Sequence, residues 1–252
     1  MAQVINGMIV GKVGTMTYYE QDGKQMVRTA CNIKNKRKTG DQFKQMMHFL
    51  NRNHLWMVMK WTEKVFFEGE KSSAQRQFLA ANNNLPDVYL PKSKNGKFNA
   101  VLQPGMVVSD GPLPSFDYQL GEFQGEPALL TTLTEADAQK GELLLYVFQQ
   151  VEKDQGPSIK TKVIDLRQPT DGVKVTIHEG HLVLTCPLFS DNMSGFGLVH
   201  VVKEHASHQT IVTNCTYYQQ FTTEDALMEA ARSYGRLEIY NEQQWYVTLP
   251  NK

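Results

Sequence analysis

Residues 173–186 read Val-Lys-Val-Thr-Ile-His-Glu-Gly-His-Leu-Val-Leu-Thr-Cys and contain the pattern that decides the fold. Two short runs rich in Val, Leu and Ile stand on either side of Glu179-Gly180. A two-residue connection with glycine is typical of a tight β-hairpin, because glycine accepts the backbone angles that such turns require. The segment therefore predicts two antiparallel strands, with His178 and His181 facing each other across them.

Runs of the same kind recur through residues 105–218, separated by turns that contain Gly, Pro or Asp. Short strands at such spacing are typical of a β-sandwich. The strands that we expect are 128–133, 142–151, 159–166, 173–178, 181–186, 196–204 and 209–217. The predicted fold class is therefore α+β and mainly β, with the sandwich domain at 105–218.

The N-terminal part predicts a β-hairpin followed by a long helix. Residues 8–20 indicate one strand, Asp22-Gly23 a turn, and residues 25–33 the returning strand. The helix is expected at about 41–66, where apolar residues recur every three or four positions. Three further apolar residues of that helix lie off the stripe, and we expect them at an interface with a partner: Phe49, Trp56 and Met59.

Shorter signals complete the predicted organisation. Ser72 with Gln75 predicts a capping box that opens a second, short helix. Prolines and glycines at 85–104 indicate a linker or a long loop, so the basic hairpin-helix domain is expected at 1–90. The tail, 219–252, predicts a helix capped by Thr222 or Thr223, followed by a β-hairpin with strands at 236–241 and 244–249.

Charge divides the chain at the predicted linker, although the total is zero. Residues 1–104 carry 16 Lys and Arg against 7 Asp and Glu, a net charge of +9, and residues 105–252 carry 10 against 19, a net charge of −9. Such asymmetry indicates a basic surface that meets something acidic. That partner is either nucleic acid or the acidic half of a neighbouring copy.

The basic stretch is the strongest functional signal, and three interpretations remain open. Lysine and arginine supply phosphate contacts, and Tyr18 and Tyr19 are placed to stack on bases. A docking patch for an acidic protein surface is the second interpretation, and a solvated loop is the third. The residues concerned are Lys24, Arg28, Lys34, Lys36, Arg37, Lys38, Lys44 and Arg52.

Signals for catalysis and cofactors are weak. No Ser, Cys or Asp stands in the context of a nucleophile elbow or catalytic triad, so we expect no enzyme. His178 and His181 would face each other, but no further ligand completes a metal-binding spacing, so neither a metal nor a cofactor is expected. His54, on the apolar stripe, is expected to be a hydrogen-bonded core residue.

Location follows from what the sequence lacks. No apolar run is long enough for a membrane span, and the N-terminus has no secretory signal. The three cysteines, Cys31, Cys186 and Cys215, are an odd number without a paired motif, so we expect reduced thiols. These observations favour a cytoplasmic or virion-associated protein without membrane contact.

Several motifs resemble those of a known group of proteins. They are Gly11-Lys12-Val13-Gly14, Gly23-Lys24 with Arg28, Asn35-Lys36-Arg37-Lys38-Thr39, Gln42, Phe49 and Thr213-Asn214-Cys215-Thr216-Tyr217. The pattern, over about 7–218, resembles an uncharacterised domain-of-unknown-function family common in Bacteroides-type gut bacteria and their mobile elements. The resemblance implies a hairpin-helix element joined to an immunoglobulin-like sandwich, and it implies no catalytic residue.

Together these signals favour a non-enzymatic assembly protein. A basic and an acidic half on one chain favour head-to-tail contacts between copies, which build rings or filaments. By analogy with the family, we expect a structural component of a phage or phage-like particle, forming homo-oligomers or binding other particle proteins. The alternative is a nucleic-acid-binding protein that uses the basic half.

Overall fold

The computed structural model describes residues 3–5, 8–13, 16–21, 24–29, 38–62, 64–68, 73–93, 99–153, 156–234, 237–241 and 244–248. The fold is α+β with strands predominating, as predicted. The chain forms two compact units, Met1–Lys38 and Thr39–Lys252. Their junction does not coincide with the border predicted between 85 and 105.

The N-terminal unit is an antiparallel meander rather than a single hairpin. Its strands, in spatial order, are β1 (Gln3–Ile5), β2 (Met8–Val13), β3 (Met16–Gln21) and β4 (Lys24–Thr29). Gln21 pairs with Lys24, which confirms the hairpin predicted around Asp22-Gly23. The single strand predicted at 8–20 is wrong, because Val13 pairs with Met16 and the chain reverses between them.

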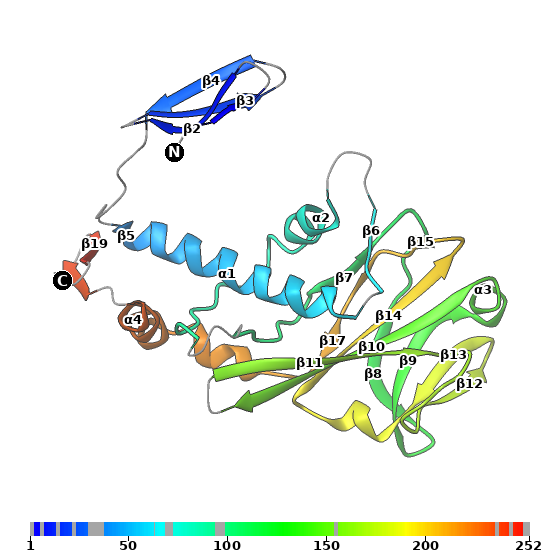
Figure 1. Ribbon diagram of the computed structural model, residues 1–252. Coiled ribbons are helices and arrows are strands. Elements are labelled where there is room, and N and C mark those ends of the chain that lie inside the picture. The colour runs from blue at the N-terminus through cyan, green and yellow to red at the C-terminus, as the bar shows by residue number, and fades with distance from the viewer. Residues whose placement is uncertain are drawn as a thin grey trace. The chain divides into compact units, whose positions relative to one another are not determined.

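The larger unit consists of two facing sheets and a helical layer (Figure 1). The central sheet has the order β11-β10-β14-β15, with β17 also pairing with β14. Its strands are β10 (Glu142–Lys153), β11 (Gly156–Asp165), β14 (Ser194–Val202), β15 (His205–Ala206) and β17 (Val212–Thr213). The facing sheet has the order β12-β13-β9-β8. It comprises β8 (Tyr118–Phe123), β9 (Glu126–Thr134), β12 (Lys174–His178) and β13 (His181–Thr185).

Strand β10 is covered on both faces because its side chains alternate between two cores. Leu143, Leu145 and Val147 lie in the core between the two sheets. The alternate side chains, Leu144, Tyr146 and Phe148, lie in the core under the helices. Burial on both faces explains why residues 143–148 are continuously apolar, whereas strands with one solvated face alternate.

The helical layer is formed mainly by α1 (Gly40–Lys60) and α2 (Ala74–Ala81). α1 ends six residues before the predicted end at 66, where Thr62 donates its hydroxyl to the carbonyl oxygen of Met59. The chain then enters the short strand β6 (Phe66–Phe67). The capping box predicted at Ser72 is wrong, because the N-cap is Ser73 and its side chain makes no capping hydrogen bond.

Most of the described residues of the predicted linker, at 85–93 and 99–104, are buried rather than exposed. Buried amide side chains bind its backbone in place of a strand ladder, because buried backbone groups require partners. The Val101 amide donates to Asn51 Oδ1 at 3.3 Å, and the Leu102 amide donates to Gln150 Oε1 at 2.8 Å. Gln103 Nε2 donates to the carbonyl oxygen of Pro86 at 2.6 Å. Prolines and glycines therefore mark an irregular segment of the larger unit.

The remaining elements complete the unit. A three-stranded sheet joins β6 to β7 (Val107–Asp110) and β16 (Gln209–Thr210). The tail forms α4 (Glu224–Ser233) and a hairpin of β18 (Leu237–Asn241) and β19 (Gln244–Thr248), as predicted. Of the two candidate caps, Thr223 accepts a hydrogen bond from the Ala226 amide. The other elements are β5 (Lys38–Thr39), α3 (Glu135–Ala138) and two 3-10 helices, η2 (Pro187–Ser190) and η3 (Tyr217–Phe221).

Candidate functional site

Two exposed cations of the N-terminal unit lie on one face of its four-stranded sheet. Lys24 and Arg28 are both exposed on β4, and their even spacing places them on the same side. The Arg28 guanidinium lies 5.7 Å from the ring centroid of Tyr19, which is a cation–π contact. Lys38 begins β5. Lys34, Lys36 and Arg37 lie outside the described residues.

One cation predicted for the same basic surface, Lys44, instead has a partner within the larger unit, and so does a second cation of residues 1–104. Lys44 Nζ lies 3.9 Å from a carboxylate oxygen of Glu224, which belongs to the acidic half. Lys64 is paired in the same way with Glu142 at 3.8 Å. The charge asymmetry is therefore satisfied in part by contacts inside one chain.

Arg52 is a structural residue rather than a surface cation. Its side chain is buried, and it donates to the carbonyl oxygen of Leu79 at 3.2 Å and to Asn83 Oδ1 at 2.7 Å. Burial lowers the pKa of its guanidinium, while Asp87 acts in the opposite direction. Arg52 thereby ties α1 to the end of α2, so its inclusion in the basic surface was wrong.

The three residues predicted at an interface divide into two groups. Trp56 and Met59 are buried in the core under the helices, where the Trp56 ring lies 5.6 Å from the Phe78 ring. Phe49 is exposed. The wide apolar circumference of α1 is thus explained largely by its contacts with the sheet and α2, and only Phe49 remains on the surface.

An apolar surface that the sequence did not predict lies on the N-terminal sheet. Four of its side chains are exposed although they are large and apolar: Ile9, Val13, Met16 and Val27. The strand register places all four on one face, because Val13 pairs with Met16 and Tyr18 pairs with Val27. Lys24 and Arg28 occupy the opposite face. We call these two surfaces the apolar face and the cationic face.

The sequence contains the apolar residues of this face, but the single strand predicted at 8–20 gave them the wrong register. Treating 8–20 as one strand places Val13 and Met16 on opposite sides, since side chains alternate along a strand. With a reversal after Val13, the two residues become neighbours on one face.

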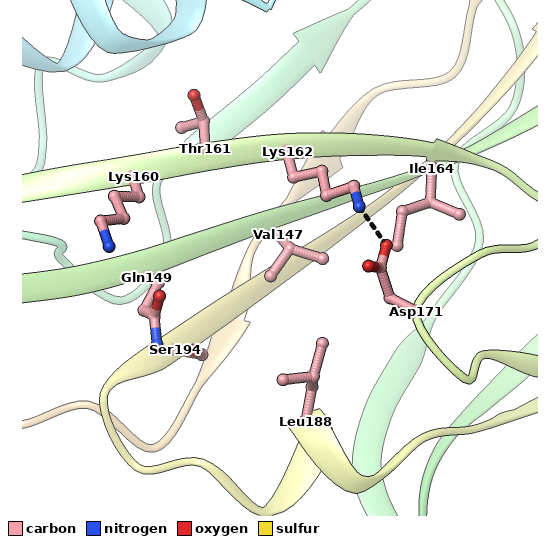
Figure 2. Close-up of a pocket in the computed structure, with 9 residues that line it drawn as sticks. All are labelled: Val147, Gln149, Lys160, Thr161, Lys162, Ile164, Asp171, Leu188 and Ser194. Atoms are coloured by element: carbon pink, nitrogen blue, oxygen red, sulfur yellow. Dashed lines mark ion pairs between the residues drawn. The ribbon is translucent and has the colours of Figure 1, made fainter.

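A pocket of about 290 Å³ opens beside the central sheet in the larger unit (Figure 2). Val147, Ile164 and Leu188 form its apolar part, and Lys162 pairs with Asp171 at its rim. Lys160 lies farther along β11. Among the described strands, β11 lies at the edge of this sheet, and lysines on an edge strand discourage pairing with other chains. Edge protection accounts for both lysines without a ligand.

Several histidines form hydrogen bonds with protein groups. His178 pairs with His181 across the hairpin, as predicted, and His181 Nδ1 lies 3.2 Å from the carbonyl oxygen of Thr132. His205 and His208 lie 2.9 and 3.0 Å from carboxylate oxygens of Glu68 and Asp110. Within the described residues, no three His, Cys, Asp or Glu side chains are grouped to hold a metal ion.

Among the described residues, two histidines and two cysteines are buried. His54 Nδ1 bonds to the carbonyl oxygen of Asn99, as expected for a core histidine, and burial lowers its pKa. Burial also lowers the pKa of His200. Cys186 and Cys215 are free thiols whose pKa values are raised by burial.

Among the described residues, no helix has both the length and the apolar character needed to cross a membrane. Comparisons with protein-family models, with curated proteins and with solved structures found no match for this chain. The two faces of the N-terminal sheet are therefore the features of the described residues that bear most on function.

Proposed function

We propose that this chain is a non-enzymatic assembly protein that forms homo-oligomers through its N-terminal unit. The observation that carries the proposal is the apolar face of Ile9, Val13, Met16 and Val27 on a separate compact unit. Exposed apolar side chains grouped on one surface usually mark an interaction site. A unit of 38 residues is also below the size at which most domains fold without a partner or a cross-link.

The basic stretch at residues 34–38 is proposed to strengthen assembly by meeting acidic side chains of a neighbouring copy. Exposed carboxylates for such a contact exist in the larger unit, including Glu179 and Glu224. Complementary charges steer association and fix orientation more than they add affinity. Charge is therefore assigned the second role, after the apolar face.

Light scattering on the full chain over a range of concentrations tests the proposal. A molar mass that rises with concentration supports assembly, and a monomer throughout contradicts it. The variant with Lys34, Lys36, Arg37 and Lys38 changed to Glu should assemble less, and the difference from wild type should shrink in high salt, because salt screens exposed charges. An unchanged variant would remove the basic stretch from the mechanism.

Nucleic-acid binding is the second candidate, and the cationic face favours it. The cationic face has two cations, Lys24 and Arg28, on an exposed strand beside the aromatic ring of Tyr19. Proteins that bind single-stranded nucleic acids use the same combination of cations and aromatic rings. A mobility-shift titration at two salt concentrations tests it. Affinity that falls steeply with salt, and a shallower dependence in a Lys24→Gln/Arg28→Gln variant, would support this function.

Two finer statements belong to the same proposal. We propose that the facing sheets are the immunoglobulin-like sandwich that the family resemblance implies, with the helical layer added on the outer face of the central sheet. We further propose a phage or phage-like particle as the assembly, with the protein in the cytoplasm or in the virion. Capsid, portal or tail genes beside its own gene would support that location, and their absence would count against it.

A further inference from the structure

The pocket beside the central sheet lies where long strands extend past short ones. β10 and β11 have 12 and 10 residues, whereas β12 and β13 of the facing sheet have five residues each. On the face of β10 that meets the facing sheet, Leu145 and Val147 are buried, but the next residue on that face, Gln149, is exposed. The facing layer therefore ends between Val147 and Gln149, and the pocket opens at that point.

The floor of the pocket is apolar and only partly covered. Val147 and Ile164 belong to the core between the two sheets, and both also line the pocket. Leu188, on η2, lines the same pocket and is 36% exposed although it is a large apolar side chain. A hydrocarbon group bound there would contact these three side chains and remove part of Leu188 from water, which favours binding.

Two polar side chains at the open end of the pocket have no partner in the described part of the chain. Gln149 and Lys160 are opposite each other in the strand register, and both extend from the sheet on the same side as Val147 (Figure 2). Neither side chain forms a hydrogen bond or an ion pair with another described residue. Edge protection accounts for the lysines of β11, but it does not account for a free amide and a free ammonium beside an apolar floor.

The charges around the pocket leave one positive charge for a ligand. Lys162 pairs with Asp171, which also accepts a hydrogen bond from the Thr170 hydroxyl at 2.9 Å. The contact with Lys162 lowers the pKa of Asp171, so this carboxyl group stays ionised and neutralises Lys162. Among the described residues that line the pocket, Lys160 then remains as a cation without a counter-ion.

From this arrangement we propose that the pocket binds a small monocarboxylate with a hydrocarbon chain. The carboxylate meets the Lys160 ammonium and the Gln149 amide, and the hydrocarbon chain lies on Val147, Ile164 and Leu188. Pockets for small molecules begin at about 300 Å³, so a volume of about 290 Å³ suits a short chain. This site lies in the larger unit and does not depend on assembly through the N-terminal unit.

The test titrates octanoate and octanamide into the full chain and follows the backbone amide signals by two-dimensional NMR. The two probes share one hydrocarbon chain and differ in the charge of the head group. We expect saturable shifts at β10, β11 and η2, with a dissociation constant of about 1 mM or below for octanoate. The constant for octanamide should be about three- to fivefold higher, because an exposed charge pair contributes modestly. No saturable shift up to about 10 mM octanoate, or shifts confined to other elements, overturns the inference.

Three variants separate the head-group contact from the apolar contact. Lys160→Gln should raise the dissociation constant of octanoate about three- to fivefold and leave that of octanamide within about 1.5-fold. Lys174→Gln removes the same charge from β12, outside this pocket, and should change neither constant by more than about 1.5-fold. Leu188→Ala shortens the apolar wall and should raise both constants about threefold.

The outcomes that contradict the site are equally specific. Wild-type affinity for octanoate in Lys160→Gln, or equal losses in Lys160→Gln and Lys174→Gln, overturns recognition of the carboxylate by Lys160. Wild-type affinity for both probes in Leu188→Ala overturns the apolar part of the site. Amide spectra without probe show whether β10 and β11 remain folded, and Lys160→Arg, which retains the charge, should bind octanoate within about twofold of wild type. Weak binding of Lys160→Arg in a folded chain would also count against the charge contact.

Discussion

Strand β10 and strand β4 illustrate two ways in which an antiparallel strand can be stabilised. On β10 the side chains of one face pack under the helices, and those of the other pack against the second sheet. On β4 the residues from Lys24 to Arg28 are all exposed. The covered strand obtains its stability within the chain, whereas the open strand leaves its apolar side available to another molecule. The comparison shows that strand formation and strand burial are specified separately.

The largest expected effect tests burial. Phe148→Ala should lower the free energy of unfolding of the larger unit by about 3–5 kcal/mol, because Phe148 is fully buried and a cavity remains. Val27→Ala should change that same free energy by less than about 0.5 kcal/mol, since the side chain is exposed. Urea denaturation monitored by tryptophan fluorescence measures both. If both variants lower the free energy of unfolding equally, the distinction between the covered and the open sheet is contradicted.

The next effect compares two arginines. Arg52→Met should destabilise the larger unit by about 2 kcal/mol, because it leaves the Leu79 carbonyl and Asn83 without a charged donor. Arg28→Met removes only an exposed cation–π contact and should cost about 0.5 kcal/mol or less, measured by local hydrogen exchange in β3 and β4. If Arg52→Met leaves the free energy of unfolding unchanged, the structural role assigned to Arg52 is contradicted.

Lowering the pH should destabilise the larger unit through its buried histidines, but not the N-terminal unit. Burial lowers the pKa of His54 and His200 in the folded chain, so the unfolded chain binds protons more readily. The free energy of unfolding should therefore fall as the pH drops below about 6.5, by up to about 1.4 kcal/mol per pH unit for each histidine. A His54→Gln/His200→Gln variant should show a flatter profile in pH-dependent denaturation. Residues 1–38 contain no histidine, so a similar loss in the N-terminal unit would contradict this explanation.

Local signals predicted the covered region well. The turn at Glu179-Gly180, the apolar run at 143–148 and the helix cap at Thr223 each fix an element through neighbouring residues, and each is present in the structure. Glycine in a two-residue turn and a cap three residues before its donor are constraints that a sequence carries by itself.

Longer-range features were beyond the sequence. Trp56 and Arg52 are buried by segments that lie more than twenty residues away, so their surroundings could not be inferred from α1 alone. The apolar face required the reversal after Val13, and one register error moves every following side chain to the other side. The burial of the irregular segment at 85–104 could not be inferred, because its backbone is satisfied by side chains of distant segments.

The meander of the N-terminal unit also has a consequence for synthesis on the ribosome. Each of its strands pairs with the next one, whereas β10 needs β14, which ends at Val202. At about 5–20 residues per second, the interval between residues 38 and 202 lasts about 8–33 seconds. During that interval the first sheet is complete while the central sheet lacks a strand. Nascent chains on one messenger RNA would then present their apolar faces to one another before the rest of the chain has folded.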